Sequence, residues 1–312
     1  MQTLSNIAIT ADAEAIKNII ATHGHAAEHN YNHFINIGEM MGECSFCIID
    51  NNFGIMSYKN KNDIWCYSDP IAPEEKRLEI FLQFVECSFE NGAKKVRAEV
   101  NEKLWAEIIQ KIKLEHKNKF RTVKPSYIYQ WPVYDLKKWD MSLTGIKWKK
   151  LRNMRNAFTR DHKIEIFHNA SNGTGSIKEN FSQQELINFL KKWKKLRQGK
   201  DMAHTEHYES AIKSNFEGYD FVRLIYVDGA IAALNGGWKI ANSNNVYLQL
   251  GLPNYGMKNI GDFSYLNDLE FFKSIGFDFA DLGGSTPEMM HFKNKFSPAY
   301  VYRTVEFSIV EK

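Results

Sequence analysis

Short runs of alternating apolar and polar residues make up the first half of the chain and predict strands. The runs "CSFCIID" (44–50) and "FGIMSYK" (53–59) are joined by Asn51-Asn52, which favours a hairpin, and "DIWCYS" (63–68) follows them. Pro73-Glu74-Glu75 opens a predicted helix that ends near Asn91 and Gly92. The half is completed by the strand "KKVRAEV" (94–100), the helix "EKLWAEIIQKI" (102–112) with Asn101 as its cap, and the strand "SYIYQWPVYDL" (126–136).

The second half repeats this order of elements with different residues. Asp228-Gly229 joins the strands "FVRLIYV" (221–227) and "AIAALNGGWKI" (230–240), and "NVYLQLGL" (245–252) is the third strand. A helix is predicted from about Asn259 to Ser274, with a stop near Gly276. The strand "FDFADLGG" (277–284), a helix from Pro287 through Phe296, and the strand "AYVYRTVEFSI" (299–309) follow.

The order strand, strand, strand, helix, strand, helix, strand resembles the core of the GNAT acyltransferase fold. We therefore expect an α+β protein with two tandem GNAT-like domains, residues 1–140 and 141–312. Each domain should have its own mixed, mainly antiparallel sheet flanked by helices. The length of 312 residues is comfortable for two domains. The connection between them also holds a polar Gly/Ser/Asn loop, residues 169–176.

Composition places the chain among ordinary globular proteins. Apolar residues are 44% and charged residues 25% of the sequence. No apolar run approaches the ~18 residues that a membrane span needs, and the N-terminus lacks the pattern of a secretory signal. These features predict a cytoplasmic protein. The four cysteines fit reduced thiols better than a zinc site, because Cys44 and Cys47 form only one C-x-x-C pair.

A strongly basic helix is predicted to open the second domain. Residues 147–163 contain seven Lys or Arg and one acid, although the net charge of the chain is only +3. Trp148, Leu151, Met154 and Phe158 recur at helical spacing and should be buried, which leaves the cations on the other faces. A second helix with an apolar stripe carries Lys191, Lys192, Lys194, Lys195 and Arg197. We expect an anionic ligand at the first helix, polyphosphate or an RNA backbone, since solvated helix faces usually mix both signs of charge.

Three segments resemble the C-terminal domain of phosphatidylglycerol lysyltransferases. They are "YSDPIAPEE" (67–75), "LTGIKWKKLRNMRNAFTRDHKIEI" (143–166) and "DLGGSTPEMMHFKNKFSPAYVYR" (281–303). They correspond to the family's D-P-x-x-P segment, its G-x(5)-L-R-x-x-x-N basic helix and its K-x-K-F-x-P element. The last segment is also similar to the peptidoglycan FemA/FemX transferases. Both groups are tandem GNAT-fold enzymes that use aminoacyl-tRNA.

The resemblance implies a soluble aminoacyltransferase that takes its aminoacyl group from aminoacyl-tRNA, with no tightly bound cofactor. The lipid-modifying members have a membrane-embedded portion that this sequence lacks. We therefore expect an amine or hydroxyl acceptor on a small molecule or peptide in place of a membrane lipid. On the basic helix, the predicted contacts with the donor's phosphates are Lys149, Arg152, Arg155 and Asn156.

Such a reaction needs orientation, proton transfer and stabilisation of an oxyanion. Gly283, Gly284 and Ser285 follow a predicted strand and can bring backbone N–H groups close to a ligand, or simply form a turn. Lys293 matches the family's motif lysine and is expected to neutralise a phosphate or the oxyanion, whereas Lys295 should point elsewhere. Asp281 is the candidate general base or a helix cap, and Tyr300, with Tyr302 beside it, is the candidate proton donor or a plain strand residue.

Two other functions remain open. An acetyl-CoA-dependent GNAT would use the segment "GLPNYGMKNIG" (251–261), whose glycines match the phosphate-binding loop imperfectly. A non-catalytic module could read RNA or a phosphorylated ligand through the basic helix. His25, His29 and His33 would share one face of a helix, but their pattern is not H-E-x-x-H, so we expect no metal site.

Overall fold

The computed structural model describes residues 12–170, 182–196 and 205–312. Most of the predicted polar loop 169–176, and Arg197 on the second basic helix, lie outside these residues. The N-terminal half (residues 12–135) contains α1 (Ala13–His23), α2 (Tyr31–Met41), β1 (Glu43–Ile49), β2 (Phe53–Asn60), β3 (Asp63–Cys66), α3 (Glu74–Glu90), β4 (Lys95–Asn101), α4 (Glu102–Glu115), β5 (Phe120–Thr122) and β6 (Tyr127–Asp135). The C-terminal half (residues 136–312) contains α5 (Lys149–Asp161), β7 (Ile164–Ala170), α6 (Gln183–Leu196), α7 (Glu206–Lys213), β8 (Phe221–Val227), β9 (Ala230–Lys239), β10 (Asn245–Pro253), α8 (Ile260–Ser274), β11 (Phe279–Asp281), α9 (Pro287–Lys293) with a 3₁₀ turn (Asn294–Phe296), and β12 (Tyr300–Glu311).

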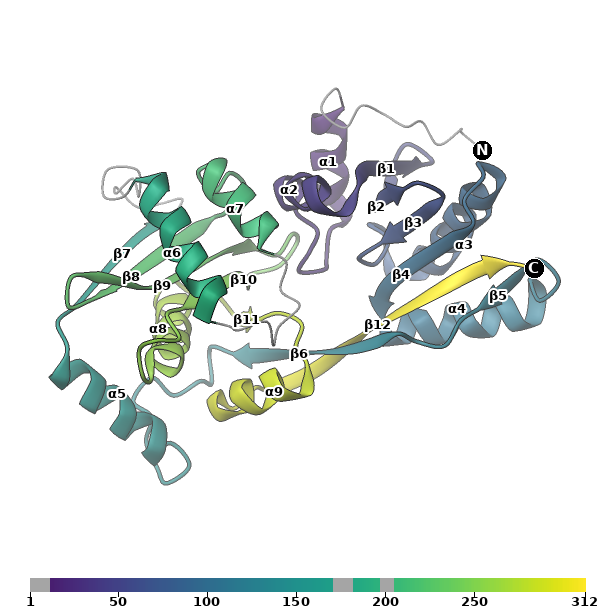
Figure 1. Ribbon diagram of the computed structural model, residues 1–312. Helices are drawn as coiled ribbons and strands as arrows, with labels where there is room; N and C mark the ends of the chain where they lie inside the picture. Colours follow the sequence, from purple (N-terminus) through teal and green to yellow (C-terminus); the bar gives the residue numbers. More distant parts are fainter. Residues whose placement is uncertain (1–11, 171–181, 197–204) are drawn as a thin grey trace.

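The two halves share one sheet, so the expectation of two separate sheets is wrong. Within the described residues the sheet has 12 strands, in the order β1-β2-β3-β4-β12-β6-β11-β10-β9-β8-β7, with β5 paired to β12. Figure 1 shows β6 and the long β12 running side by side through the middle of the molecule. The sheet is mixed and mainly antiparallel, with parallel pairs at β3–β4 and β10–β11.

The sheet is continuous because the halves exchange their last strands. The last strand of the C-terminal half, β12, pairs with β4 of the N-terminal half, from Thr304–Asn101 to Val310–Lys95. The last strand of the N-terminal half, β6, pairs with β11 of the C-terminal half. The two exchanged strands pair with each other from Tyr300–Val133 to Glu306–Tyr127. Residues about 200 positions apart in the sequence therefore lie on neighbouring strands.

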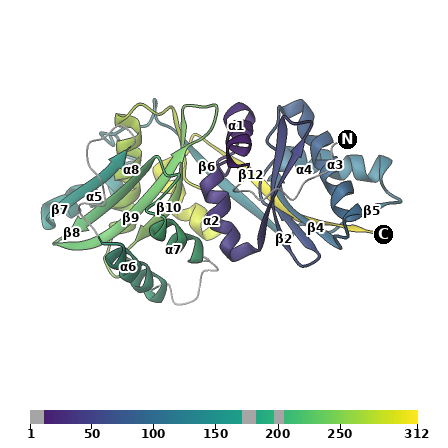
Figure 2. The ribbon, with the colours of Figure 1, turned by 90° about the horizontal axis from the view of Figure 1, so that it is seen from above.

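Helices cover both faces of each half (Figure 2). In the N-terminal half, α1 and α2 pack on one face of the strands and α3 and α4 on the other. In the C-terminal half, α6 and α7 pack on one face, while α5 and α8 pack on the other. None of the described helices is long and apolar enough to cross a membrane.

Local signals in the sequence account for most element ends. The Asn101 side chain accepts a hydrogen bond from Lys103 N–H at the start of α4. Pro287 begins α9, and Gly276 adopts φ +89° just after α8. Of the apolar stripe predicted for α5, Trp148, Leu151 and Phe158 are at most 6% exposed, and Met154 is partly buried against the core. All four cysteines are free thiols.

The segment between α1 and α2 is tied to the C-terminal half. The indole N–H of Trp238 donates to the carbonyl of Ala27 (2.7 Å), and the Asn242 amide donates to Gly24 (2.9 Å). The Asn30 amide donates to the Gly218 carbonyl (2.9 Å). Because α2 begins only at Tyr31, His25 and His29 precede the helix, and the three histidines do not form one helical face. Residues 25–28 of this segment cover the space next to the exchanged strands β6 and β12.

The strand exchange predicts that residues 1–140 do not fold alone. Without β12, β4 loses its antiparallel partner, and Phe307 and Ile309 leave the core beneath α3 and α4. Burying each such side chain contributes about 1.5–3 kcal/mol, and a whole domain is stable by only about 5–15 kcal/mol. The isolated fragment should show no cooperative thermal transition by circular dichroism. Adding a fragment of residues 141–312 should restore one, and a cooperative transition of fragment 1–140 alone would contradict the prediction.

Candidate active site

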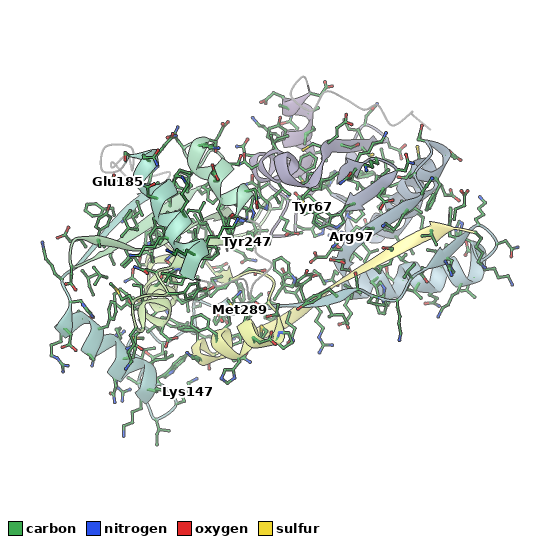
Figure 3. The ribbon with its side chains drawn as sticks, in the orientation of Figure 1. Tyr67, Arg97, Lys147, Glu185, Tyr247 and Met289 are labelled. Carbon is green, nitrogen blue, oxygen red and sulfur yellow. The ribbon has the colours of Figure 1, made fainter. Side chains whose placement is uncertain are left out.

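A cavity of about 290 Å³ lies where the two halves meet. Its walls come from the segment after α1, the ends of β3 and β4, the exchanged strands β6 and β12, and the start of β11 and neighbouring residues of the C-terminal half. In Figure 3 Tyr67, beside the cavity, lies near the centre of the molecule. The lining residues are His25, Ala26, Ala27, Glu28, Tyr67, Ser68, Asp69, Glu99, Val100, Asn101, Trp131, Val133, Ile240, Asn245, Phe279, Asp281, Tyr300, Tyr302 and Thr304.

The cavity exists because two parallel strands separate. The pairing of β3 with β4 ends at Cys66–Ala98, and the chain then diverges through Tyr67 and Ser68. The carboxylate of Asp69 bridges the gap by accepting a hydrogen bond from Asn101 N–H (2.8 Å). The separated strand ends leave room for a ligand, so this opening is the candidate site.

His29 holds the roof of the cavity in place. Its Nε2 lies 2.9 Å from the Asp69 carbonyl, and its Nδ1 accepts from the backbone N–H groups of His25 and Ala26. Burial lowers the pKa of His29 to about 3, so the ring is neutral and suits these two roles. Among the described residues, no group of three or more His, Cys, Asp or Glu is placed to hold a metal.

Four carboxylates face the cavity, and none of the described lining residues is Lys or Arg. Burial, together with the neighbouring acids, raises the pKa of Glu28 well above its ordinary value. Burial likewise raises the pKa of Glu99 to about 7 and that of Asp281 to about 6. Burial would also raise the pKa of Asp69, but the His25 imidazole and the Asn101 N–H outweigh it and lower this pKa. The site favours a positively charged ligand and repels a phosphate.

Aromatic rings form another part of the cavity wall. Trp131 and Tyr302 stack with ring centroids 5.5 Å apart, and Tyr67, Phe279 and Tyr300 continue the surface. Aromatic faces attract cations, so this wall and the carboxylates favour the same kind of ligand.

One buried polar atom in the wall, the hydroxyl oxygen of Ser68, has no hydrogen-bond partner, and this residue is only 5% exposed. Nε2 of His25 lies 3.7 Å from Asp69 Oδ2. Buried polar groups are normally hydrogen-bonded, and an unpartnered one at a functional site calls for a ligand. The acid cluster and the Ser68 hydroxyl therefore mark the same cavity as a binding site.

Asp281 and Tyr300, both predicted from the sequence, line this cavity. Asp281 accepts from Gly283 N–H (2.8 Å) through Oδ1 and from the Tyr302 hydroxyl (2.7 Å) through Oδ2. Its two oxygens are thus engaged within the protein. Tyr300 is 51% exposed at the mouth of the cavity.

Lys293 lies behind the cavity wall and is only 3% exposed. Its Nζ donates to the carbonyls of Leu282 and Gly283 (3.0 Å for Gly283), and burial lowers its pKa to about 8. These two carbonyls directly follow β11, whose parallel pairing with β10 ends at Tyr247–Asp281. Lys295 instead pairs with Asp262 at the surface (2.9 Å), away from Lys293 as expected.

The loop of Gly283, Gly284 and Ser285 needs its glycines for packing. Gly283 adopts φ +84°, which favours glycine. A Cβ on Gly284 would lie 3.1 Å from ring atoms of Trp131, which is tighter than almost all real contacts. Ser285 is buried and donates to the Gly283 carbonyl (3.1 Å). The loop therefore packs closely against the ring of Trp131.

The basic helix α5 does not line the cavity. Figure 1 places it at the far end of the C-terminal half, and Figure 3 shows Lys147 remote from Tyr67 and Tyr247. Arg152 donates to the carbonyls of Leu143 and Gly145, and Arg155 donates to Met141 and pairs with Glu270 (2.8 Å). Lys149 and Asn156 are exposed. The structure therefore does not bring the predicted residues of α5 together with Asp281 and Tyr300.

Three of the four cavity acids, Glu28, Asp69 and Glu99, were not among the predicted site residues. Asp69 lies inside the quoted D-P-x-x-P segment, which could have singled it out. Glu99 occupies an ordinary polar position of an alternating strand, and Glu28 sits in a His/Asn-rich turn. Only the fold brings them together.

Comparison with known proteins supports both the fold and the family. The model of the family described as phosphatidylglycerol lysyltransferase, C-terminal, matches residues 29–250, which ends before the segment 281–303. A comparison with curated proteins finds no match.

Solved structures with the same fold include two lysylphosphatidylglycerol synthetases. The C-terminal domain of a protein assigned to this activity in Agrobacterium fabrum has a TM-score of 0.69 at 16% identity, covering 98% of this chain and 92% of that one. L-PGS from Bacillus licheniformis has a TM-score of 0.65 at 14% identity, covering 96% and 91%. A tandem GNAT protein from the clavulanic acid pathway reaches 0.51 at 9% identity, covering 96% and 95%. At these identities the likeness shows the fold alone, a mixed GNAT-like sheet flanked by helices.

The raised pKa of Asp281 predicts a loss of stability as the pH rises. Between about pH 4 and 6 the folded protein keeps a proton on Asp281 that the unfolded chain releases, so the free energy of unfolding falls across this window. In Asp281→Asn, the decrease in the free energy of unfolding between pH 4 and 6 should be smaller by about 1–3 kcal/mol than in wild type. Urea denaturation at several pH values measures it. The surface variant Asp278→Asn should show the same decrease in the free energy of unfolding as wild type. An unchanged slope in Asp281→Asn would show that this carboxyl is not protonated in the fold.

Proposed function

We infer the function from the family: the chain belongs to the family of the phosphatidylglycerol lysyltransferase C-terminal domain, whose fold is that of acyltransferases. We propose that it is an aminoacyltransferase that moves an aminoacyl group from aminoacyl-tRNA to an amine or hydroxyl of a small molecule or peptide, with no tightly bound cofactor. The proposal places it in the cytoplasm, where charged tRNA is available.

The acid-lined cavity is the observation that carries this proposal. Every aminoacyl ester has an α-ammonium group beside the reactive carbonyl, and four carboxylates with an aromatic wall suit that cation. The phosphates of the donor would be repelled by the same carboxylates and must stay outside. Only the aminoacyl end of the donor then enters the opening between β3 and β4.

The predicted catalytic residues fall into two groups in this proposal. Asp281 and Tyr300 lie in the cavity, with Tyr300 at its mouth, where a hydroxyl can donate to the leaving oxygen. Lys293 acts from behind, since its amine holds the carbonyls of Leu282 and Gly283 and so positions the loop through Ser285. Its charge also offsets the negative charge that gathers near Asp281.

The helix α5 is the proposed contact for the donor's phosphates. Arg152 and Arg155 are engaged by carbonyls and by Glu270, so they shape the helix and the preceding loop. The exposed Lys149 and Asn156 present the side chains that can reach a phosphate. A tRNA is long enough to touch α5 while its aminoacyl end lies in the cavity.

The repeated order of elements supports an origin from two tandem GNAT-like domains, 1–140 and 141–312, whose last strands have exchanged. Acetyl-CoA remains the alternative donor. It would bind where β10 and β11 separate, after Tyr247–Asp281, but its acetyl group offers no cation to the acid-lined cavity. We therefore favour aminoacyl-tRNA.

Binding of purified charged tRNA, uncharged tRNA and acetyl-CoA to the protein tests the proposed donor. We expect charged tRNA to bind more tightly than uncharged tRNA, because only the charged form places an ammonium among the cavity acids. Filter binding or fluorescence anisotropy at a fixed salt concentration gives the comparison. A preference for acetyl-CoA would overturn the tRNA donor, and equal binding of both tRNAs without turnover would favour an RNA-binding module.

The salt dependence of tRNA binding tests the role of α5. Lys149→Gln combined with Lys150→Gln should flatten the plot of log affinity against log salt by about one to two units of slope, because each phosphate contact contributes about 0.7–0.9. The exposed lysines of the N-terminal half supply a control, Lys113→Gln with Lys117→Gln, which should leave the slope unchanged. Equal slopes in the two double variants would show that α5 is a solvated face.

A further inference from the structure

The cavity also identifies a proton acceptor for the reaction, an inference that rests on the proposed aminoacyl transfer. We propose that Glu99 is the general base of the site and that the acceptor it serves is a primary amine. Glu99 lies on β4 at the point where β3 separates from it, so its carboxylate faces the open cavity while Ala98 and Val100 face the core.

A chain of hydrogen bonds fixes the orientation of this carboxylate. The indole N–H of Trp131 donates to Thr304 Oγ1 (2.9 Å), and the Thr304 hydroxyl donates to Glu99 Oε1 (2.6 Å). When Glu99 is ionised it has no proton to give, so the Thr304 hydroxyl is the donor of this bond. Thr304 is the hydrogen-bond donor that the described residues offer to Glu99, and a carboxylate has about four acceptor positions. The others remain for a ligand.

The other three acids are less suited to take a proton. Asp281 has both oxygens engaged, by Gly283 and Tyr302. Asp69 is held by the Asn101 N–H and has a lowered pKa, which makes it a weak base. Burial raises the pKa of Glu28 well above its ordinary value, so this group holds its proton more tightly than an ordinary glutamate. Glu99, with a pKa of about 7, can both accept and release a proton near neutral pH.

The groups that face Glu99 come from every neighbouring element. Glu28 and Asp69 approach from the roof and from the end of β3, and Arg97 precedes Glu99 on the same face of β4. From β12 come Thr304 and Glu306, and Glu306 is itself paired with Arg97 (2.7 Å). From β6 comes the phenol of Tyr129. Two ammonium groups, one on the aminoacyl donor and one on the acceptor, would balance the negative charge of this cluster.

The proposed step balances as follows. The acceptor ammonium gives one proton to the Glu99 carboxylate, and the free amine attacks the ester carbonyl carbon to form the C–N bond. The ester C–O bond then breaks, and the ribose oxygen leaves with the proton held by Glu99. The surplus proton of the new amide nitrogen passes to Glu99 and then to solvent. The products are an amide, a free ribose hydroxyl and one released proton.

Calorimetry with a small cation tests Glu99 without requiring turnover. The probe is alaninamide, which carries the α-ammonium of an aminoacyl group, titrated at pH 7 in two buffers of different ionisation enthalpy. Wild-type protein should release protons on binding, because a cation beside Glu99 favours its charged form. Glu99→Gln should release fewer, while Glu115→Gln, which changes an exposed carboxylate of α4 outside the lining, should release as many as wild type. Absent binding, or undiminished release in Glu99→Gln, overturns the proposal.

The pH profile of transfer gives the second readout, with ethanolamine as an acceptor that offers both an amine and a hydroxyl. Glu99→Gln should lower turnover about 10²–10⁴-fold and abolish the rise of the rate with pH. Thr304→Val removes a hydrogen-bond donor to Glu99 and should move that rise to higher pH. Glu306→Gln removes a neighbouring negative charge and should move the rise to lower pH.

An alkali-labile ester product would overturn the amine acceptor. Full turnover with an unchanged profile in Glu99→Gln would overturn the base while leaving aminoacyl transfer intact, whereas a wild type that prefers acetyl-CoA refutes the donor.

Discussion

The ladder between β6 and β12 joins the halves of this molecule, and the cavity depends on it. Each of these strands closes the sheet of the other half, so β12 brings Thr304 to Glu99 and Tyr302 to Asp281, while β6 brings Trp131 to both Thr304 and Tyr302. The hydrogen bonds that position the cavity acids cross this seam. The exchange therefore does more than fuse two sheets, because it assembles a polar site from residues that neither half contains alone.

The charge of the site runs opposite to that of the chain. A protein with a net charge of +3 gathers four acids in one cavity and leaves its strongest basic run on a distant helix. Like charges in a poorly solvated space cannot all ionise, so the cavity keeps protons on some of its carboxyl groups. A cationic ligand relieves this repulsion. In the proposed reaction, the distance between α5 and the cavity also orients the donor, because its phosphates are attracted to α5 and its ammonium group to the cavity acids.

The elements were predictable because their signals are local. Asn101 caps α4, Gly276 follows α8 and Pro287 begins α9, and each acts through the backbone of its nearest neighbours. Apolar and polar residues alternate along β6 and β12 in the same way whichever half these strands pair with. Their exchange therefore cannot be read from the sequence pattern. The same limit applies to Glu28 and Glu99, whose importance comes from each other's position. Asp281 and Tyr300 were found through a motif, whereas the engagement of both Asp281 oxygens by Gly283 and Tyr302 appears only in the folded protein.

By itself the sequence determined the succession of strands and helices, the buried stripe of α5, the duplication of one plan, and the family. These properties arise from residue periodicity, turn chemistry and short motifs, which act over a few positions. Tertiary structure alone decided that the halves share a sheet, that Arg152 and Arg155 bind carbonyls and Glu270, and that the acids converge on one cavity. Those outcomes depend on contacts between residues far apart in the chain, and no local pattern encodes which distant partner a strand edge or a carboxylate will meet.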